Sequence, residues 1–370
     1  MRFFIIGIIF WVLTAGCENK TQPKDIEPFQ TFKPEYARHF LWEEHNGFTI
    51  LKILSPYPGG KPRTYILLPQ DADVRMLPDS LRNFEVIRTP VEKIIATSVT
   101  HLEPLYALGE GDKLIGFAQA SYIVNPWFKK RVEEGKIEEV GNGLMMNTEK
   151  VMMLRPDVIL GFSSQGESAD QRNFSKHKIP YLYVAEWLET HPLGRAEWIK
   201  VFGLLTHREK KADSIFSEIK KKYEAIKHKA SQNRGKKPMV FQGGIFQDKF
   251  YVPGGQSWAA QLIHDAGGKY VLSTDKNTES KVLSYEQALA YLNRSDIWLN
   301  PGSFETKEQL VKAFPALAHS KIGKEGEIWN LYTEHFFEKS VLHPEYVLED
   351  LYHIFKNDNI RQYHFARPVK

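Results

Sequence analysis

The sequence of 370 residues contains a single cysteine, Cys17. One cysteine excludes intramolecular disulfides and zinc sites built from several thiolates. The chain also has little excess of either charge, because 49 Lys and Arg residues stand against 45 Asp and Glu residues, for a net charge of +4. An excess that small argues against a nucleic-acid-binding protein. Hydrophobic (42%) and charged (25%) fractions are ordinary, which excludes a disordered or fibrous chain and fits about two domains.

The common catalytic signatures are also absent. Neither G-x-x-x-x-G-K-[ST] nor G-x-G-x-x-G occurs, and the 13 histidines include no H-E-x-x-H pair. The nearest approach is G-F-S-S-Q at 161–165, which has Gln165 where the tight turn of a nucleophile elbow requires glycine. We therefore predict no enzyme activity, no resident cofactor and no bare metal site. A secreted hydrolase centred on Ser163 and a metal-ion receptor that uses histidines are the less favoured alternatives.

The N-terminus has the features of a lipoprotein signal. Arg2 precedes an uncharged run from Phe3 to Val12, and small residues lead directly to Cys17. Such a segment is too short to span a membrane and is typical of a cleaved secretory signal. We predict a signal peptide over 1–16, lipidation of Cys17, a polar flexible tether over 17–34 and a bacterial cell-envelope protein facing the periplasm. The alternative is a buried free cysteine behind an ordinary signal.

The rest of the chain alternates short apolar runs with helical patterns, which is typical of βαβ units. Two extended runs around a Pro/Gly turn, 48–54 and 64–68, predict a β-hairpin before the first of these units. The predicted parallel strands are 94–97, 114–117, 158–160, 181–184, 239–242 and 296–299. We predict an α/β fold with two Rossmann-like lobes, an N-terminal lobe with its β-hairpin extension over 35–195 and a C-terminal lobe over 236–370.

A single long amphipathic helix is predicted between the lobes, over 206–232. Apolar residues recur there every three or four positions, and lysines occupy the other faces. Capping boxes are predicted at its start, from Thr206 to Glu209, and also at Thr100 to Glu103 and at Ser284 to Gln287.

In open α/β sheets, ligands bind at the carboxyl ends of the strands. The loops that follow the predicted strands carry aromatic and small polar residues, so we expect two lobes to present them across an apolar cleft. The candidate ligand-binding residues are Ser98, Thr100, His101, Gln119, Tyr122, Phe162, Phe246, Trp258, Phe304, Trp329 and Tyr332. Any one of the aromatic rings could instead belong to the core. His101 could equally point at a ligand or cover the start of its helix.

Several segments resemble the substrate-binding proteins of ABC importers for iron complexes, haem and cobalamin. K-I-I-A-T-S-V-T-H at 93–101, L-Y-A-L-G at 105–109 and L-R-P-D-V-I-L at 154–160 are similar to the first lobe of that family. Q-L-I-H-D-A-G-G at 261–268 is similar to its second lobe, and the resemblance covers about 90–355. The family, also called the helical-backbone or class III family, implies two lobes bridged by one helix and a non-catalytic receptor that delivers its ligand to an inner-membrane permease.

The resemblance also implies partners. An acidic residue on each lobe of the family docks to arginines of the permease; Glu167 matches on the first lobe, and Gln256 stands at or beside the position of the second. The expected ligand is an iron complex, either a ferric siderophore or haem, for which His101 or Tyr122 could be an axial ligand. Cobalamin or another corrinoid is the alternative, because the candidate loops carry almost no Arg or Lys for an anionic siderophore.

Overall fold

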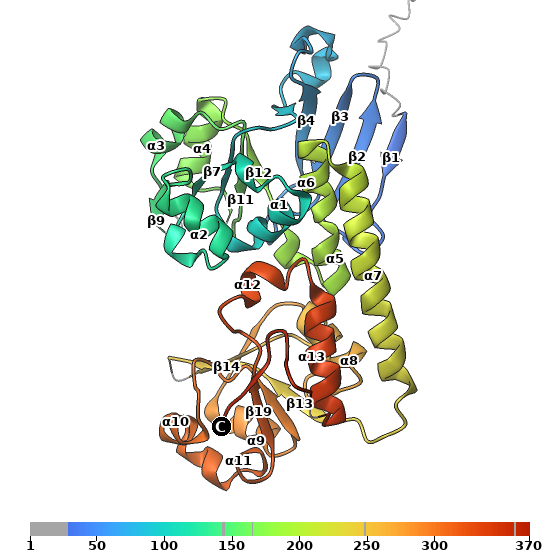
Figure 1. The fold of residues 1–370 in the computed structure, drawn as a ribbon, viewed down its shortest axis with the longest axis vertical. Coiled ribbons are helices and arrows are strands. Elements are labelled where there is room, and N and C mark those ends of the chain that lie inside the picture. The colour runs from blue at the N-terminus through green and yellow to red at the C-terminus, as the bar shows by residue number, and fades with distance from the viewer. Residues whose placement is uncertain (1–28, 143–144, 165, 248, 359) are drawn as a thin grey trace, which may run out of the picture.

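Two α/β lobes, one above the other in Figure 1, make up most of the structure, and one long helix runs beside both. The computed structural model describes residues 29–142, 145–164, 166–247, 249–358 and 360–370. Each lobe has its own largely parallel sheet. The predicted fold class, two α/β lobes bridged by a single long helix, is confirmed.

The sheet of the first lobe has five parallel strands in the order β12-β11-β6-β7-β8. Its strands are β6 (Ile94–Ala96), β7 (Leu114–Phe117), β8 (Glu138–Glu139), β11 (Val158–Gly161) and β12 (Tyr181–Tyr183). Its helices are α1 (Leu102–Leu108), α2 (Pro126–Glu133), α3 (Thr148–Leu154) and α4 (Ala169–Lys176), and a hairpin of β9 (Gly141–Asn142) and β10 (Met145–Met146) precedes α3. The central strands β6 and β11 are completely buried, as apolar runs without alternation predict.

The sheet of the second lobe has the order β16-β13-β18-β19-β20 and is parallel except for β20. Its strands are β13 (Met239–Gln242), β16 (Lys269–Tyr270), β18 (Ile297–Leu299), β19 (Glu327–Asn330) and β20 (Arg367–Pro368). A separate antiparallel sheet contains β14 (Gly244–Phe246), β15 (Lys249–Val252) and β17 (Lys281–Leu283). The helices are α8 (Trp258–Asp265), α9 (Tyr285–Leu292), α10 (Lys307–Ala313), α11 (Lys321–Lys324), α12 (Phe336–Lys339) and α13 (Pro344–Lys356).

The predicted β-hairpin is present and belongs to a larger sheet in the order β1-β2-β3-β4-β5. Its strands are β1 (Gln30–Phe32), β2 (Phe40–His45), β3 (Phe48–Ile53), β4 (Arg63–Pro69) and β5 (Glu85–Thr89). Side chains alternate along β3, so that Leu51 and Ile53 join the main core while Phe48 and Ile50 join a second cluster under Leu77. Both faces of this sheet are therefore covered.

The N-terminal sheet is held to the rest of the molecule by two buried carboxylates. Glu197 accepts hydrogen bonds from the backbone amides of residues 35–37 at 2.8–3.0 Å. Glu189 accepts from the amides of Arg38 and His39 at 2.8 and 3.1 Å. Strand β1 lies at 30–32, inside the range expected to be a flexible tether, because Phe32 stacks on Trp42 with 3.8 Å between ring centroids.

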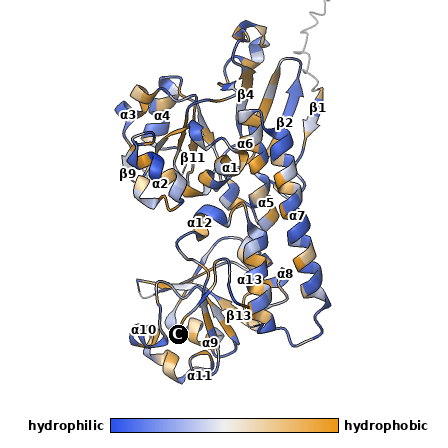
Figure 2. Cartoon of the chain, in the orientation of Figure 1, coloured by the Kyte–Doolittle hydropathy of each residue, from blue (hydrophilic) through white to orange (hydrophobic). Residues whose placement is uncertain are grey.

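The two lobes are joined by α5 (Pro192–Glu197), α6 (Ile199–Thr206) and α7 (Glu209–Gln232). Figure 2 shows apolar and polar residues alternating around α7, which packs on α6 at one end and on α13 and α8 at the other. The predicted capping box at Thr206 is wrong. Thr206 ends α6, where its hydroxyl donates to the Phe202 carbonyl at 2.8 Å, and the chain turns at His207, which has a φ of 56°.

A buried polar contact ties α7 to the second lobe. The Tyr223 hydroxyl donates to Asp265 at the end of α8 (2.8 Å), and Gln261 donates to the other oxygen of the same carboxylate at 2.8 Å. Lys227 lies 3.5 Å from Asp265 and supplies the opposite charge. These partners stabilise a carboxylate that has no exposed surface.

The predicted signal peptide and Cys17 lie outside the described residues. Across the parts of the chain that the structure describes, we find no helix with the length and apolar character needed to cross a membrane.

Candidate ligand-binding site between the lobes

Ser98, Thr100 and His101 follow β6, as predicted, in a short 3-10 turn that leads into α1. The predicted capping box at Thr100 is wrong, because the residue that caps this turn is Ser98, whose hydroxyl accepts from the amide of Thr100 and lies 2.8 Å from the Thr100 hydroxyl. His101 is 1% exposed and lies beside the ring of Phe202. Burial lowers the pKa of His101 to about 3, so its ring is neutral and enclosed in the first lobe.

The other first-lobe candidates lie on neighbouring loops. Gln119 precedes and Tyr122 ends a 3-10 turn after β7, and the Tyr122 ring is 62% exposed. Phe162 follows β11, and its ring lies 5.3 Å from that of Trp187 (centroid to centroid). The carboxyl ends of three strands therefore carry these candidates, as the rule for open sheets predicts.

Three second-lobe candidates have different surroundings. Phe246 ends β14 and is 61% exposed. Phe304 is half-buried against the core of the lobe. Trp329 is also half-buried; its indole donates to Glu327 at 3.0 Å, and its ring packs against Tyr363. None of these contacts joins Trp329 to another candidate residue.

The remaining candidates, Trp258 and Tyr332, meet at a residue that the sequence interpretation missed. Arg195 of α5 places its guanidinium 4.3 Å from the ring centroid of Trp258, the first residue of α8. Tyr332 follows β19, and its amide donates to the side chain of Asn300. The ring of Tyr332 is 42% exposed. Desolvation of its hydroxyl raises the pKa of that group, and Gln242, Arg195 and Asn300 oppose the shift.

Glu186 connects this group to the first lobe. It lies in the turn after β12, is 3% exposed, and its carboxylate interacts with the Thr100 hydroxyl and with the charge of Arg195. We name the residues Thr100, Glu186, Arg195, Trp258 and Tyr332 the interlobe cluster. It contains side chains from both lobes and from the linker.

Burial dominates the electrostatics of the interlobe cluster. Desolvation raises the pKa of Glu186, although Arg195 and the Thr100 hydroxyl oppose the shift. Desolvation likewise lowers the pKa of Arg195, and Glu186 opposes that shift. Burial therefore disfavours the charged form of both groups, and their mutual attraction offsets that cost only in part.

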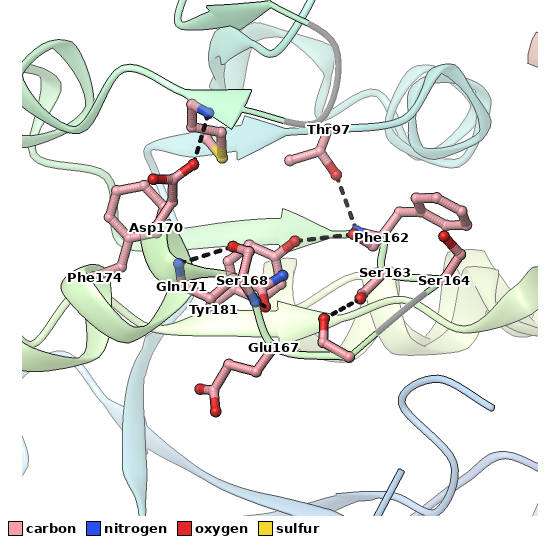
Figure 3. A pocket seen from close by; sticks show the side chains of 12 residues that line it. Thr97, Phe162, Ser163, Ser164, Glu167, Ser168, Asp170, Gln171, Phe174 and Tyr181 are labelled. Atoms are coloured by element: carbon pink, nitrogen blue, oxygen red, sulfur yellow. Dashed lines mark hydrogen bonds between the residues drawn. The ribbon is translucent and has the colours of Figure 1, made fainter. Parts of the chain in front are cut away.

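A cavity of about 300 Å³ lies in the first lobe, at the carboxyl ends of β6 and β11 (Figure 3). Thr97 accepts from the amide of Phe162 at 2.9 Å, and the hydroxyl of Ser163 donates to the carbonyl of Gly166. The residues that line this cavity include no histidine that could activate Ser163. In addition, the described residues contain no group of three or more His, Cys, Asp or Glu side chains placed to hold a metal ion.

The two expected permease contacts lie on different lobes. Glu167 is exposed at the rim of the same cavity and forms a salt bridge of 3.2 Å with Arg63 of β4. Gln256 is exposed beside a cavity of about 540 Å³ in the second lobe, which His264 and Lys269 also line. Because each cavity belongs to one lobe, an aromatic cleft formed by both lobes stays a prediction.

The segment around α12 makes direct contact between the lobes. Glu338 accepts from the amide of Val124 at 2.6 Å, and His343 lies 3.5 Å from Glu103 and 3.0 Å from Glu345. Burial opposes protonation of His343, but these two carboxylates raise its pKa to about 9. The imidazolium therefore joins α1 of the first lobe to α13 of the second.

Taken together, two α/β lobes, a helical linker and a partly buried polar cluster between them define a bilobal binding protein. Residues 94–332 match the periplasmic binding protein family, and the chain belongs to that family. Over 95% of its length it is 25% identical to an uncharacterised lipoprotein of Methanocaldococcus jannaschii, 92% of which is covered.

Solved structures share the fold. A periplasmic haem-binding protein from Pseudomonas aeruginosa is similar with a TM-score of 0.59 and 16% identity, over 76% of this chain and 98% of that one. A periplasmic vitamin B12 binding protein from Vibrio cholerae is similar with a TM-score of 0.54 and 15% identity, over 72% and 98%. At these sequence identities, the comparison shows a shared fold and no more.

Proposed function

We propose that this protein is a lipid-anchored substrate-binding protein of an ABC importer that captures an iron complex, either a ferric siderophore or haem, between its lobes. The observation that carries the proposal is the interlobe cluster, where Trp258 and Tyr332 of the second lobe and Glu186 of the first each interact with Arg195. A site built from both lobes suits a ligand held between them. Membership of the periplasmic binding protein family and the fold shared with a haem-binding protein support the same role.

Cobalamin is the second candidate ligand. The fold shared with a vitamin B12 binding protein supports it, and exposed rings such as Tyr122 and Phe246 suit a bulky ligand with little charge. The two candidates differ in charge, which makes them separable by experiment.

The test is a fluorescence titration of the purified protein with haemin, cyanocobalamin and a ferric tris-catecholate. Trp258 lies in the interlobe cluster, so a bound chelate is expected to quench its emission, and equilibrium dialysis corrects for absorption by the chelates. Saturable binding of one chelate with one site per chain supports the proposal. If none of the chelates binds, the proposed function is rejected.

The same preparation separates the rival functions. Hydrolysis of an activated ester that is lost in Ser163→Ala would identify a hydrolase. Tight binding of zinc or manganese without any chelator would identify a metal-ion receptor.

We also propose Glu167 as the first-lobe contact to the permease, with Gln256 as an uncharged contact on the second lobe. Glu167 is exposed, but it is paired with Arg63. Docking to a permease arginine would therefore exchange one cationic partner for another. Glu167→Ala is expected to reduce ligand uptake in cells while leaving chelate binding by the purified protein unchanged.

A further inference from the structure

Arg195 is a buried cation whose capacity to donate hydrogen bonds is not fully used. It is 9% exposed, and its Nε has no hydrogen-bond partner among the described residues. A guanidinium carries five N–H donors in a planar fork, and a buried donor without a partner costs free energy. The guanidinium carbon lies 4.3 Å from the ring centroid of Trp258, and this contact restricts the movement of the fork.

The groups around Arg195 leave that donor free. Glu186, Glu189 and Tyr332 all favour the charged form of Arg195 through electrostatic attraction. One carboxylate oxygen of Glu186 and the side-chain amide nitrogen of Asn300 also lack partners within the described parts of the chain. Asn300 is 3% exposed and accepts from the amide of Tyr332, and Glu186 and Tyr332 both act on the charge of Arg195. Native structures rarely leave several buried polar groups unpaired unless water, an ion or a ligand completes them.

We propose that Arg195 is a specificity-determining residue that selects chelates carrying an oxyanion, such as a carboxylate or a catecholate, over neutral chelates. This inference rests on the proposed function, because it assigns a charge to the ligand bound between the lobes. A guanidinium binds oxyanions through two parallel hydrogen bonds, and it does so most strongly where water is excluded. A neutral corrinoid would leave the donor of Arg195 unpaired.

The experiment compares anionic chelates with neutral counterparts. Dissociation constants are measured for haemin and its dimethyl ester, in which the two carboxylates are blocked, and for a trianionic ferric tris-catecholate and a neutral ferric tris-hydroxamate. Arg195→Gln removes the charge and Arg195→Lys retains it. Arg294→Gln is the control, because Arg294 is also stacked on a ring, that of Tyr291, but is exposed in the second lobe.

We expect the wild-type protein to bind at least one anionic chelate more tightly than its neutral counterpart. Arg195→Gln should weaken that binding about 10- to 100-fold and leave the affinity for neutral chelates unchanged, since a hydrogen bond to a charged group has that strength. Arg195→Lys should recover part of the loss, and Arg294→Gln should have no effect. Glu186→Gln should tighten anion binding, because it removes a carboxyl group that competes for the guanidinium.

Three results would overturn the inference. The first is equal or tighter binding of neutral chelates by the wild-type protein, which needs no variant and so does not depend on folding. The second is an unchanged preference for anionic chelates in the Arg195→Gln variant, provided that this variant melts at the wild-type temperature. The third is weaker anion binding in Glu186→Gln, which would show that the carboxylate contacts the ligand. All three leave the proposed function intact, whereas a protein that binds no chelate rejects both proposals.

Discussion

At the scale of single residues, the most informative contact is the guanidinium of Arg195 on the indole of Trp258. A cation held over an aromatic face gains about 0.5–2 kcal/mol, more when both groups are removed from water. The ring therefore positions the guanidinium in addition to offering its own surface to a ligand. Removing the ring should affect both contributions.

Trp258→Ala is expected to weaken chelate binding by about 1 kcal/mol or more, as truncation of an aromatic anchor in a binding site does. Trp258→Phe keeps a ring under the guanidinium and should lose less. Isothermal titration calorimetry measures both, because it does not depend on tryptophan emission. Equal affinities for wild type and Trp258→Ala would place the ring outside the site.

The sequence predicted part of this site for a definable reason. The rule that ligands bind at the carboxyl ends of strands located Thr100, Trp258 and Tyr332. The same rule applies to the turn after β12, but that turn is followed by a helical segment without small polar residues, so Glu186 and Arg195 were not selected. Their role depends on α8 of the second lobe, and the contact between Arg195 and Trp258 spans 63 positions that local patterns do not relate.

At the scale of secondary-structure elements, α7 is fixed to the second lobe by a buried hydrogen bond. The amphipathic spacing predicted this helix and its C-terminal end, but the capping signal at Thr206 misplaced its start because α6 ends there. The contact between Tyr223 and Asp265 could not be predicted, since polar partners on separate helices leave no periodic signal.

Tyr223→Phe is expected to lower the free energy of unfolding by about 1–3 kcal/mol, because it removes a hydrogen bond to a buried carboxylate oxygen of Asp265. Urea denaturation followed by circular dichroism measures the change. Tyr106→Phe is the control, since Tyr106 is 45% exposed. A difference of less than about 0.5 kcal/mol, the size expected for a surface change, would show that the hydroxyl contributes nothing to the attachment of α7.

The contact between α1 and α13 predicts a dependence of stability on pH. The folded pKa of His343, about 9, lies above the ordinary value of 6.5. Its contribution is therefore complete below pH 6.5 and is lost as the pH rises through 9. From the size of the shift we expect a loss of about 1–3 kcal/mol between pH 6.5 and 10.

His343→Gln should remove this loss, so that its melting temperature changes less over that range than that of the wild type. His353→Gln is the control, because it alters another histidine–carboxylate pair, with Asp358 at 3.3 Å. The interpretation fails if the two variants follow the same pH profile.

At the scale of the whole molecule, the sequence predicted the two lobes and the bridging helix correctly. The N-terminal sheet was predicted only as a hairpin. Its strands β3 and β4 meet through a local turn, which sequence patterns reveal. Strand β5 instead joins β4 in parallel after a long connection, and strand β1 is too short to show alternation.

The lipid anchor belongs to this scale as well. Cys17→Ser removes the thiol that we expect to be acylated, so the protein should move from the membrane fraction to the soluble fraction. Cell fractionation with immunoblotting measures this, and Ser98→Ala serves as a control that leaves the signal unchanged. If Cys17→Ser remains with the membranes, the anchor is not at this cysteine.

Helix α5 faces two ways at once. Arg195 and Glu197 are two positions apart, which is a rotation of about 200° around a helix. Arg195 therefore points to the lobe junction, while Glu197 accepts hydrogen bonds from the backbone of residues 35–37. The same short helix therefore carries the proposed ligand contact and the carboxylate that holds the segment 35–37, between β1 and β2. A ligand that displaced α5 would thereby also displace the start of the N-terminal sheet.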